Sequence, residues 1–318
     1  MKRKVLITGC NGFIGKNLIN HLQSLSYEVY GIDVNCTDTE HFFRVDINVY
    51  EDLQSVFKNV LPELVIHLAA RIDISFDMIW EYKTNIVGVQ NLIRLTEEIE
   101  SVKRVVWTST QLVNTLGNSF IDYDHYDANT VYGASKVIGE QLVKNGIKKK
   151  EWVIVRPSTV WGPGMGDHYL GFIKYIESGL YFNVTRKNVY KSFSYIGNTC
   201  FQIEKIIASP AKLINKRVFY LSDYHPLELH DWTNKMSLQL NRGKIISLPL
   251  LISYLIAYVF LVLKNIGFIS KVPISFYNIK NIKTTYINNN DLEQITGELP
   301  YSMIDGIKYT IEWYKNES

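Results

Sequence analysis

A phenol and an ammonium group lie four residues apart in the sequence, at Tyr132 and Lys136. Residues at this spacing share one face of a helix, so the two side chains can reach a common ligand. The phenol has an unperturbed pKa near ~10 and is a poor base at neutral pH, but a nearby cation favours the phenolate. The pair can then accept a proton from a hydroxyl group. The same spacing also occurs on solvated helices that carry no chemistry.

Three hydroxyl side chains, Thr108, Ser109 and Thr110, come at the end of the apolar run that begins at Arg104. The carboxyl ends of parallel strands form the ligand-binding edge of doubly wound α/β sheets. A threonine hydroxyl at that edge can orient a substrate oxygen, and Thr110 is the candidate. Hydrogen bonding that only closes the end of the strand is the alternative interpretation.

Three glycines follow the first apolar run, in the segment Thr8-Gly9-Cys10-Asn11-Gly12-Phe13-Ile14-Gly15. Glycines between a strand and a helix allow the backbone to turn tightly and to approach a pyrophosphate at the helix N-terminus. The segment therefore predicts a dinucleotide site, although glycine-rich turns also serve purely structural purposes. The predicted cofactor-binding residues of this turn are Gly9, Asn11, Gly12, Phe13, Ile14 and Gly15.

Asp33 ends the second predicted strand, where a carboxylate can accept hydrogen bonds from both hydroxyl groups of an adenosine ribose. A carboxylate at this place repels a 2′-phosphate, so NAD is favoured over NADP. The four residues that follow Asp33 include no arginine or lysine to neutralise such a phosphate. A basic residue from elsewhere in the chain could still do so.

A second carboxylate, Asp46, ends the run that begins at Phe42 and precedes Ile47. At this place it can receive the amino group of an adenine while the isoleucine packs on the ring. Asp46 can equally be the N-cap of the helix that follows. The residues alone do not distinguish these two readings.

Short apolar runs alternate with helical patterns through the first half of the chain, which predicts βαβ units and a parallel sheet covered by helices on both faces. The change to a turn rich in glycine and proline near Trp161 places a boundary after residue 160. We expect residues 1–160 to form one domain, to which about 191–223 return, and residues 161–318 to form mainly a smaller lobe. Predicted strands are 4–8, 28–32, 42–45, 64–68, 104–108, 152–155 and 218–221, and predicted helices are 14–25, 49–60, 78–100 and 132–144.

The composition narrows the class of protein. A net charge of +3 over 318 residues is too balanced to indicate a nucleic-acid partner. The three cysteines, Cys10, Cys36 and Cys200, have no metal-ligand spacing and form no even-numbered framework, so we expect no metal and a reducing cytoplasmic location. The first four residues lead directly into a strand, and a signal peptide is therefore not expected.

One apolar run, from Ile245 to Leu263, contains no charged residue and reaches the minimum length of a membrane span. Pro249 and several polar side chains within it argue against spanning. A helix that lies at a membrane surface and an ordinary buried helix are the other interpretations.

Taken together, the motifs resemble the extended short-chain dehydrogenase/reductase family, in particular its NAD-dependent epimerase/dehydratase branch that acts on nucleotide sugars. The resemblance covers most of the chain and implies a Rossmann fold with a C-terminal substrate lobe. Its pieces are Thr8-Gly9-x-x-Gly12-Phe13-Ile14-Gly15, Asp33, Asp46-Ile47, His67-Leu68-Ala69-Ala70, Asn85-x-x-Gly88, Thr108-Ser109-Thr110, Tyr132-x-x-x-Lys136, and Arg156-Pro157 before Trp161-Gly162-Pro163-Gly164.

The resemblance implies a role for each matched residue. Tyr132 is the acid/base, Lys136 lowers its pKa and holds the nicotinamide ribose, and Thr110 hydrogen-bonds the oxygen that is oxidised. Asp46 and Ile47 contact the adenine, and Asn85 supports the cleft from the long helix. The residues implied to line the nucleotide cleft are Leu68, Ala69 and Ala70, and His67 is expected to be a packing residue.

The departures from the family's pattern restrict the reaction. Gln111 and Leu112 stand where 4,6-dehydratases have an Asp-Glu pair, and no glutamate of the kind used by decarboxylases is near, so neither reaction is expected. Lys191 replaces an arginine often found in the second lobe, which weakens the case for pyrophosphate recognition. The resemblance leaves 4-epimerisation of a nucleotide sugar as the leading function. The alternative is an oxidoreductase that acts on a keto-sugar nucleotide, a sugar or a sterol-like hydroxyl.

Two contacts with other molecules are also implied by resemblance. Members of this family are often homodimers that associate through two long helices, here 78–100 and 132–144. The run from Ile245 to Leu263 is similar to a segment of the 3β-hydroxysteroid dehydrogenase-like subset, some of which contact membranes.

Overall fold

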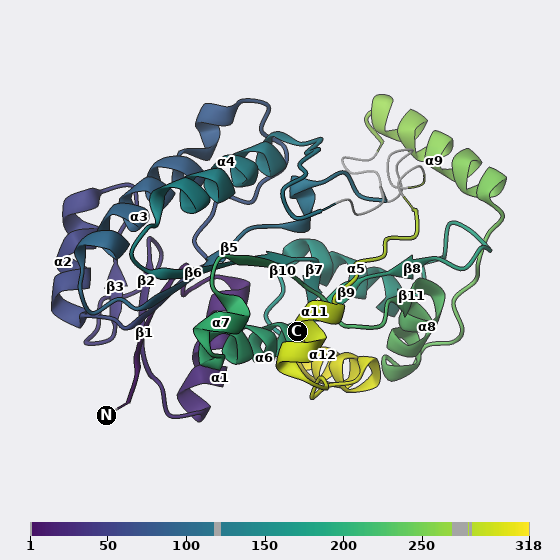
Figure 1. Ribbon diagram of the computed structural model, residues 1–318. Helices are drawn as coiled ribbons and strands as arrows, with labels where there is room; N and C mark the ends of the chain where they lie inside the picture. Colours follow the sequence, from purple (N-terminus) through teal and green to yellow (C-terminus); the bar gives the residue numbers. More distant parts are fainter. Residues whose placement is uncertain (1, 118–121, 269–278, 280–281, 318) are drawn as a thin grey trace. The chain divides into compact units, whose positions relative to one another are not determined.

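The computed structural model describes residues 2–117, 122–268, 279 and 282–317, and the chain divides into two compact units (Figure 1). Unit 1 consists of Met1–Val160, Ser194–Tyr224 and Ile287–Pro300. Unit 2 consists of Trp161–Phe193, His225–Tyr286 and Tyr301–Ser318. The return of residues 287–300 to unit 1 was not predicted from the sequence.

A seven-stranded sheet forms the centre of unit 1, in the order β10-β6-β5-β4-β1-β2-β3. All of its neighbouring strands are parallel, which confirms the predicted α/β class. The last predicted strand is present as β10 and lies beside β6. The strands are β1 (Lys4–Thr8), β2 (Glu28–Asp33), β3 (Phe42–Arg44), β4 (Leu64–His67), β5 (Arg104–Thr108), β6 (Glu151–Pro157) and β10 (Arg217–Leu221).

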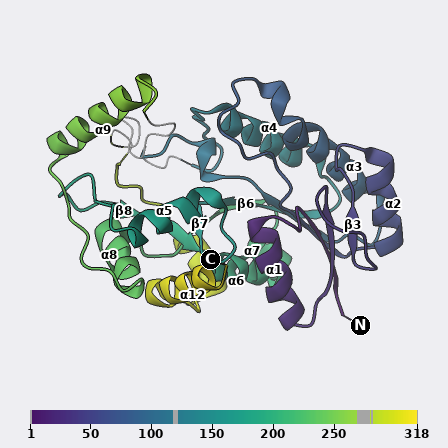
Figure 2. The ribbon, with the colours of Figure 1, turned by 180° about the vertical axis from the view of Figure 1, so that it is seen from behind.

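The sheet is covered by helices on both faces, which explains why its central strands are apolar on both sides. Helices α2 (Tyr50–Val60), α3 (Val89–Glu98) and α4 (Val131–Gly146) lie on one face (Figure 1). The opposite face carries α1 (Phe13–Ser24), α6 (Ile196–Ala208), α7 (Ala211–Ile214) and α11 (Asn290–Thr296) (Figure 2). Helices α1, α2 and α3 each bury residues at helical spacing, most of them apolar. In α2 the stripe is Leu53, Val56, Phe57 and Val60.

The segment 78–100, predicted as one helix, is interrupted. A 3₁₀ turn, η1 (Ile79–Tyr82), and a widened π-type turn, η2 (Thr84–Gly88), precede α3. Gly88 lies so close to Ile47 that a Cβ on this glycine would be 2.5 Å from the isoleucine Cδ1. Widened turns of this kind re-aim side chains and are frequent at functional sites. Here the widened turn contains Asn85, whose side chain is almost fully buried.

The strand order reverses between β1 and β4, because the chain leaves these two neighbours toward opposite faces of the sheet. In open α/β sheets, ligands bind beyond the carboxyl ends of the strands at such a reversal. Gly9 follows β1 and Leu68 follows β4, so both segments meet at this edge. The topology therefore brings the glycine turn and the segment after His67 together.

Unit 2 has a small aromatic core. The Trp232 ring stacks on Phe172 with 5.5 Å between centroids and meets Trp161 edge-on at 5.3 Å. The Tyr314 hydroxyl donates a hydrogen bond to the Glu177 carboxylate at 2.6 Å. The helices in the described part of unit 2 are α5 (Asp167–Glu177), α8 (Leu229–Gln239), α9 (Leu250–Asn265) and α12 (Met303–Glu317). Strand β8 (Tyr190–Lys191) pairs with β11 (Leu227–Glu228).

The apolar run from Ile245 to Leu263 gives rise to α9, which begins after Pro249. Within α9 only Ser253 and Ala257 are buried, so the interpretation of this run as an ordinary buried helix is wrong. None of the helices in the described part of the chain is long and apolar enough to cross a membrane.

Candidate active site

The glycine turn after β1 needs a backbone conformation that larger residues rarely adopt and leaves no room for a side chain. Gly9 has a φ of +75°, and a Cβ there would lie 2.7 Å from the Ala69 backbone nitrogen. Helix α1 starts after Gly12, which provides no side-chain cap. The first N–H groups of a helix have no partner within it and attract anions. The turn therefore fits a pyrophosphate at the N-terminus of α1, next to Phe13, Ile14 and Gly15.

Asp33 holds the glycine turn in place through its carboxylate. Its Oδ2 accepts a hydrogen bond from the Asn11 backbone N–H at 3.1 Å, and its Oδ1 accepts one from the Asn35 N–H at 2.9 Å. The Asn11 side-chain amide donates to the Asn35 carbonyl oxygen at 3.1 Å. A carboxylate oxygen has more than one acceptor position, so Asp33 can still receive hydroxyl groups of a ribose.

Two cations lie near the glycine turn and the end of β2, and the sequence patterns indicated neither. The register between β2 and β3 pairs Arg44 with Asp33, and the Arg44 Nε donates to the Val34 carbonyl oxygen at 3.2 Å. The exposed Lys16 lines a surface pocket of about 500 Å³ that Asn35 also lines. The residues directly after Asp33 include no basic side chain, whereas the pairing of β3 with β2 brings Arg44 to this edge.

Asp46 closes a turn before α2. Its Oδ1 accepts hydrogen bonds from the Asn48 backbone at 2.9 Å and from the Asn48 side-chain amide at 2.8 Å. The N-cap of α2 is Val49, so the reading of Asp46 as the N-cap is wrong. Ile47 is only 3% exposed, and its side chain packs against Gly88 in the core of unit 1. Ile47 thus offers little surface to an adenine ring, whereas Asp46 is exposed.

The segment after β4 is tied to the end of β1. The Leu68 backbone N–H donates to the Thr8 carbonyl oxygen at 3.0 Å, and the Ala69 N–H donates to the Thr8 hydroxyl at 3.3 Å. Both residues, like Ala70, are half-buried. These bonds place Leu68 and Ala69 against the glycine turn, as expected for residues that line a nucleotide cleft.

His67 is buried beneath this edge. Its Nδ1 lies 2.8 Å from the Thr8 hydroxyl, and its ring meets Trp107 edge-on with 5.2 Å between centroids. Burial, together with the charge of Lys136, lowers the pKa of His67 to about 3. A neutral imidazole held in this way packs the end of the sheet and does not transfer protons near neutral pH.

Asn85 joins the cleft to the helix that carries the tyrosine. Its side-chain oxygen accepts from the Arg71 backbone N–H at 2.8 Å, and its nitrogen donates to the Arg71 carbonyl oxygen at 3.0 Å and to the Ser135 hydroxyl at 2.9 Å. The Ser135 hydroxyl donates onward to the Tyr132 carbonyl oxygen at 2.7 Å. This chain of bonds fixes the first turn of α4 relative to the segment after β4.

Thr110 lies directly beside the first turn of α4. Its hydroxyl accepts from the Leu112 N–H at 3.2 Å and begins the short turn η3 (Gln111–Val113). Gly133 permits the approach, because a Cβ there would lie 2.2 Å from the Leu112 carbonyl oxygen. The Thr110 side chain lies near enough to the Tyr132 phenol to lower its pKa. The structure therefore brings together the two residues that the sequence only placed on neighbouring elements.

The Tyr132 phenol is a weak acid in this environment. Burial raises its pKa to about 12, although the nearby Thr110 side chain acts in the opposite direction. The ring of Tyr82 lies 6.1 Å away between centroids. In the protein alone the loss of hydration is the largest effect on this pKa. The lowering of the phenol pKa by Lys136 stays a prediction for the protein with a dinucleotide bound. The phenol is protonated at neutral pH and is ready to donate a proton.

Lys136 is only 7% exposed and lines a small cavity with His67, Asn85 and Ser109. Burial lowers its pKa to about 8, and the nearby carboxylate of Glu140 opposes this effect. The Ser109 hydroxyl and the His67 Nε2 are buried without a hydrogen-bond partner among the described residues. Polar atoms of this kind are suited to an ordered water or to a bound hydroxyl group.

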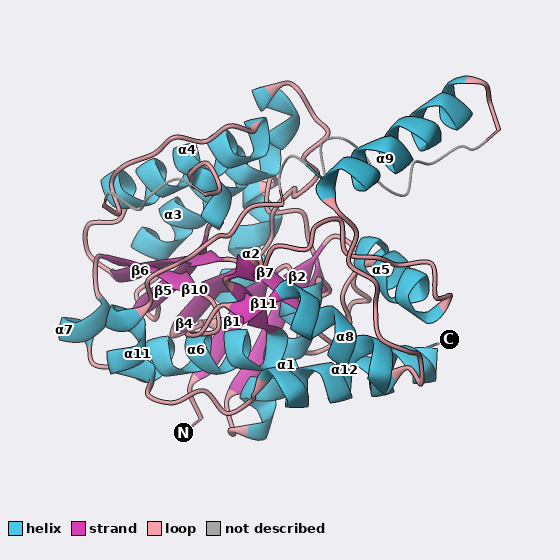
Figure 3. Cartoon of the chain, turned by 90° about the vertical axis from the view of Figure 1, so that its right-hand side faces the viewer, coloured by secondary structure: helices cyan, strands magenta, loops and turns pink. Residues whose placement is uncertain are grey.

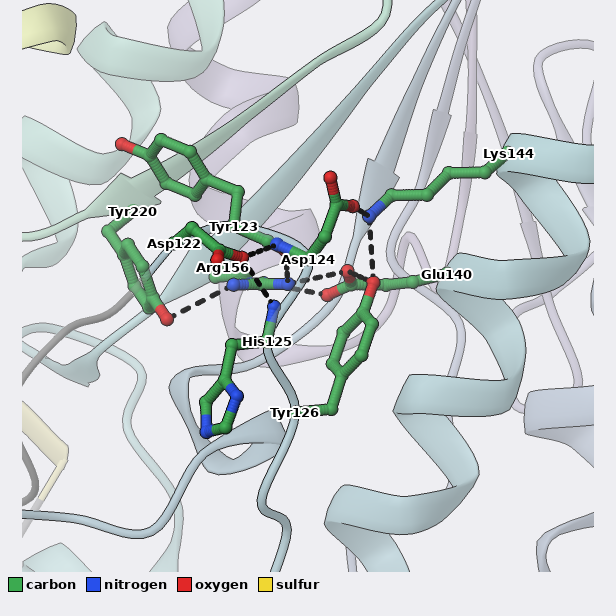
Figure 4. Close-up of polar contacts among 9 residues, drawn as sticks. All are labelled: Asp122, Tyr123, Asp124, His125, Tyr126, Glu140, Lys144, Arg156 and Tyr220. Atoms are coloured by element: carbon green, nitrogen blue, oxygen red, sulfur yellow. Dashed lines mark hydrogen bonds and ion pairs between the residues drawn. The ribbon is translucent and has the colours of Figure 1, made fainter.

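A buried ion pair fixes α4 to β6. The Arg156 guanidinium donates to both Glu140 carboxylate oxygens at 2.8 Å, and the two side chains are 0% and 2% exposed (Figure 4). Arg156 also donates to the Tyr123 carbonyl oxygen at 2.8 Å and to the Tyr220 hydroxyl at 3.1 Å. Glu140 accepts a further bond from the Tyr126 hydroxyl at 2.9 Å. The network thus binds the segment after η3, the strand β6 and the helix of Lys136 together.

Proteins of known function resemble this chain over most of its length. The model of the NAD dependent epimerase/dehydratase family matches residues 5–191. The UDP-glucose 4-epimerase of Vibrio cholerae is 30% identical over 261 residues, which cover 76% of this chain and 77% of that enzyme. The 3-beta-hydroxysteroid dehydrogenase of Mycolicibacterium neoaurum is 25% identical over 251 residues, which cover 72% and 68%.

Solved structures share the fold at low identity. The UDP-glucose 4-epimerase of Thermotoga maritima, solved with UDP-glucose, has a TM-score of 0.75 at 16% identity and is covered to 99%, as is this chain. That of Thermus thermophilus, solved with NAD, has a TM-score of 0.73 at 17% identity, with 99% of this chain and 100% of that one covered. The family model matches more than half of the length of this chain, and the chain therefore belongs to the NAD-dependent epimerase/dehydratase family.

Proposed function

We propose that the protein is an NAD-dependent epimerase of a nucleotide sugar, with Tyr132 as its acid/base. The observation that carries this proposal is the close approach of Thr110 to the first turn of α4, which holds Tyr132, with Lys136 buried one helical turn further along. The proposal is supported by the likeness to the UDP-glucose 4-epimerase of Vibrio cholerae. We assign dinucleotide binding to unit 1 and infer that unit 2 contributes substrate binding.

The residues of unit 1 fit a dinucleotide. The uncapped N-terminus of α1 receives a pyrophosphate, Asp33 receives ribose hydroxyl groups, and the exposed Asp46 is available to an adenine amino group. Lys136 is placed to hold the second ribose. When bound, the nicotinamide ring supplies a hydride acceptor and returns the hydride.

The side chains near Thr110 carry out the proton steps. Thr110 orients the sugar hydroxyl, and Tyr132 takes its proton as the hydride leaves the same carbon. The phenol, now protonated, donates to the keto oxygen when the hydride returns to the opposite face of the sugar. The charge on Lys136 stabilises the phenolate between these steps. Because the tyrosine pKa is high in the protein alone, a second positive charge, such as that of an oxidised nicotinamide, is needed for the first step.

Nucleotide release distinguishes this function from net oxidation or reduction. The purified protein is denatured, and any dinucleotide set free is identified by mass spectrometry and quantified per chain. Near-stoichiometric NAD, with interconversion of UDP-glucose and its 4-epimer when the native protein receives either sugar, would support the epimerase. A protein that releases no dinucleotide but consumes added NADH or NADPH with a keto-sugar would contradict it.

An oxidoreductase is the second candidate. The 3-beta-hydroxysteroid dehydrogenase of Mycolicibacterium neoaurum shares 25% identity over 72% of this chain, and the same three side chains suit a sterol-like or sugar hydroxyl. In unit 2, Lys191 donates a hydrogen bond to the Lys283 carbonyl oxygen, and burial lowers its pKa. A lysine engaged in this way is a weaker anchor for a pyrophosphate than a free arginine.

Cofactor preference should depend on the balance between Asp33 and Arg44. We expect Asp33→Asn to weaken the preference for NAD over NADP by about tenfold or more, because it removes a carboxylate that repels a 2′-phosphate while Arg44 remains beside it. Titration of both dinucleotides by tryptophan fluorescence measures this ratio. Asp38→Asn, near Arg44 but outside the ribose site, is the control. An unchanged ratio in Asp33→Asn would remove the ribose assignment.

We also propose that the protein forms a homodimer through the segments 78–100 and 132–144. Apolar side chains are exposed at the start of the first segment, at Met78, Ile79 and Trp80, the last of which is 71% exposed. Trp80→Glu should therefore convert a dimer into a monomer in light scattering after size exclusion. A wild-type monomer, or a dimer that tolerates this change, would contradict the assignment.

A further inference from the structure

Helix α9 in unit 2 exposes an unusually apolar surface. Large apolar side chains are exposed along its whole length, and Leu251 reaches 74%. Burying such side chains away from water stabilises a protein by roughly 1.5–3 kcal/mol each, so a monomer seldom leaves many of them together on its surface. The exposed residues of α9 are Leu250, Leu251, Ile252, Leu255, Tyr258, Val259, Leu261 and Val262.

The exposed face of α9 is wide. Successive residues of a helix are rotated by about 100°, and in this projection Leu250 and Ile252 form the two edges of the exposed face of α9. All the other exposed apolar residues of the helix lie between these edges. The exposed face thus covers an arc of about 200°, whereas a stripe buried in a core is typically about 100° wide. The remaining face is the one held by unit 2, where Ser253 donates to the Val184 carbonyl oxygen at 2.9 Å and Ala257 is 1% exposed. A helix of a second protomer covers only a narrow seam, whereas a lipid phase covers the whole arc.

The positive charge of the residues on both sides of α9 indicates the kind of surface to which this helix binds. Arg242 and Lys244 precede the helix, Lys264 lies in its last turn, and all three are exposed. Between Asp231 and Asp291 the sequence contains seven basic residues and no acidic one, although the whole chain carries only +3. Basic residues next to an apolar helix are attracted to anionic lipid headgroups.

The length of α9 excludes a crossing and favours a helix that lies in the plane of the surface. At 1.5 Å per residue its 16 residues extend about 24 Å, less than the ~30 Å hydrocarbon core of a bilayer. Figure 3 shows α9 without any other described helix of unit 2 packed along it.

We propose that α9 docks the protein on the surface of a bilayer that contains anionic lipids. The exposed apolar face of α9, whose edges are Leu250 and Ile252, enters the boundary between headgroups and acyl chains. Arg242, Lys244 and Lys264 pair with the headgroups at its margins. This interaction does not depend on which reaction the protein catalyses.

Co-sedimentation of the full chain with vesicles tests the proposal. Vesicles of phosphatidylcholine with phosphatidylglycerol should carry the protein into the pellet, vesicles of phosphatidylcholine alone should carry much less, and salt should weaken the binding. The variant Leu251→Glu/Leu255→Glu should lose at least about tenfold in binding, because each leucine contributes more than a factor of ten when buried in lipid. Leu238→Glu, on α8 of the same unit and 62% exposed, is the matched control and should bind like the wild type.

A second variant keeps the test independent of the helix itself. Arg242→Glu/Lys244→Glu changes exposed residues outside α9 and should reduce binding to the anionic vesicles alone. A wild-type chain that stays in the supernatant with both vesicle types would overturn the proposal. Equal binding to neutral and anionic vesicles would overturn the assignment of the headgroup. A dimer that only the α9 variant dissociates, without vesicle binding, would show that a second copy covers the helix.

Discussion

Replacement of Tyr132 by phenylalanine should reduce kcat by about 100- to 10,000-fold, the usual contribution of a positioned acid/base. The change removes one hydroxyl group from a ring that is only 8% exposed and that lies near Thr110. Binding of dinucleotide should change little, because the glycine turn is untouched. Steady-state kinetics on the substrate identified by the release experiment, together with a binding titration, measure the two effects separately.

Tyr82 offers a matched control for this prediction. Its ring is the neighbour of Tyr132, is fully buried, and donates its hydroxyl proton to the Asp73 carbonyl oxygen. Tyr82→Phe therefore removes the same group from the same surroundings, at a cost of about 1 kcal/mol in stability. We expect its kcat to stay within a few-fold of the wild type. If Tyr132→Phe kept most of the activity, or if both variants lost it equally, Tyr132 would not be the acid/base.

The high pKa of Tyr132 determines whether its phenol donates or accepts a proton. With a pKa raised to about 12, the phenol of the protein alone is protonated throughout the physiological range and can donate a proton at once. To accept a proton it needs a positive charge nearby, and a bound oxidised nicotinamide provides one. We therefore expect Tyr132 to accept a proton only when the cofactor is bound.

The local patterns of the sequence were sufficient to predict the sheet and the glycine turn. Each strand of unit 1 is a short apolar run, and Gly9 and Gly12 lie directly between a strand and a helix, so neighbouring residues carry the whole signal. The spacing of Tyr132 and Lys136 likewise places both on one helix without any knowledge of distant contacts. Predictions of this kind succeed because the information lies within a few residues.

Contacts between distant segments were beyond the sequence patterns. The pairing of Arg44 with Asp33 needs the register of β3 on β2, and the bonds of Asn85 with Arg71 and Ser135 need the widened turn that interrupts the predicted helix. Spacing gives the distance from Tyr132 to a cation but not the loss of hydration, which raises the phenol pKa in the protein alone. The exposure of α9 also could not be predicted, because it depends on which parts of unit 2 pack against this helix.

Removal of one partner of the Arg156–Glu140 ion pair should strongly destabilise unit 1. Glu140→Gln leaves a guanidinium that is 0% exposed without its counter-charge, and removal of one partner of such a pair typically costs about 3–5 kcal/mol. This is a large share of the ~5–15 kcal/mol by which proteins are usually stable. Urea unfolding followed by circular dichroism measures the loss. Glu98→Gln, which changes an exposed ion pair with Arg94 on α3, should have little effect and is the matched control.

The same change should also move the pH dependence of activity, because Glu140 is the carboxylate that opposes the effect of burial on Lys136. Without this negative charge the lysine pKa falls below about 8, so its ammonium loses its proton at a lower pH. The alkaline decline of kcat should then begin at a lower pH in Glu140→Gln. Arg156→Lys separates the two effects, since it destabilises the network by losing the paired hydrogen bonds but keeps the Glu140 charge. Its pH profile should match that of the wild type, and an equal shift in both variants would mean that Glu140 acts on Lys136 through the fold rather than through its charge.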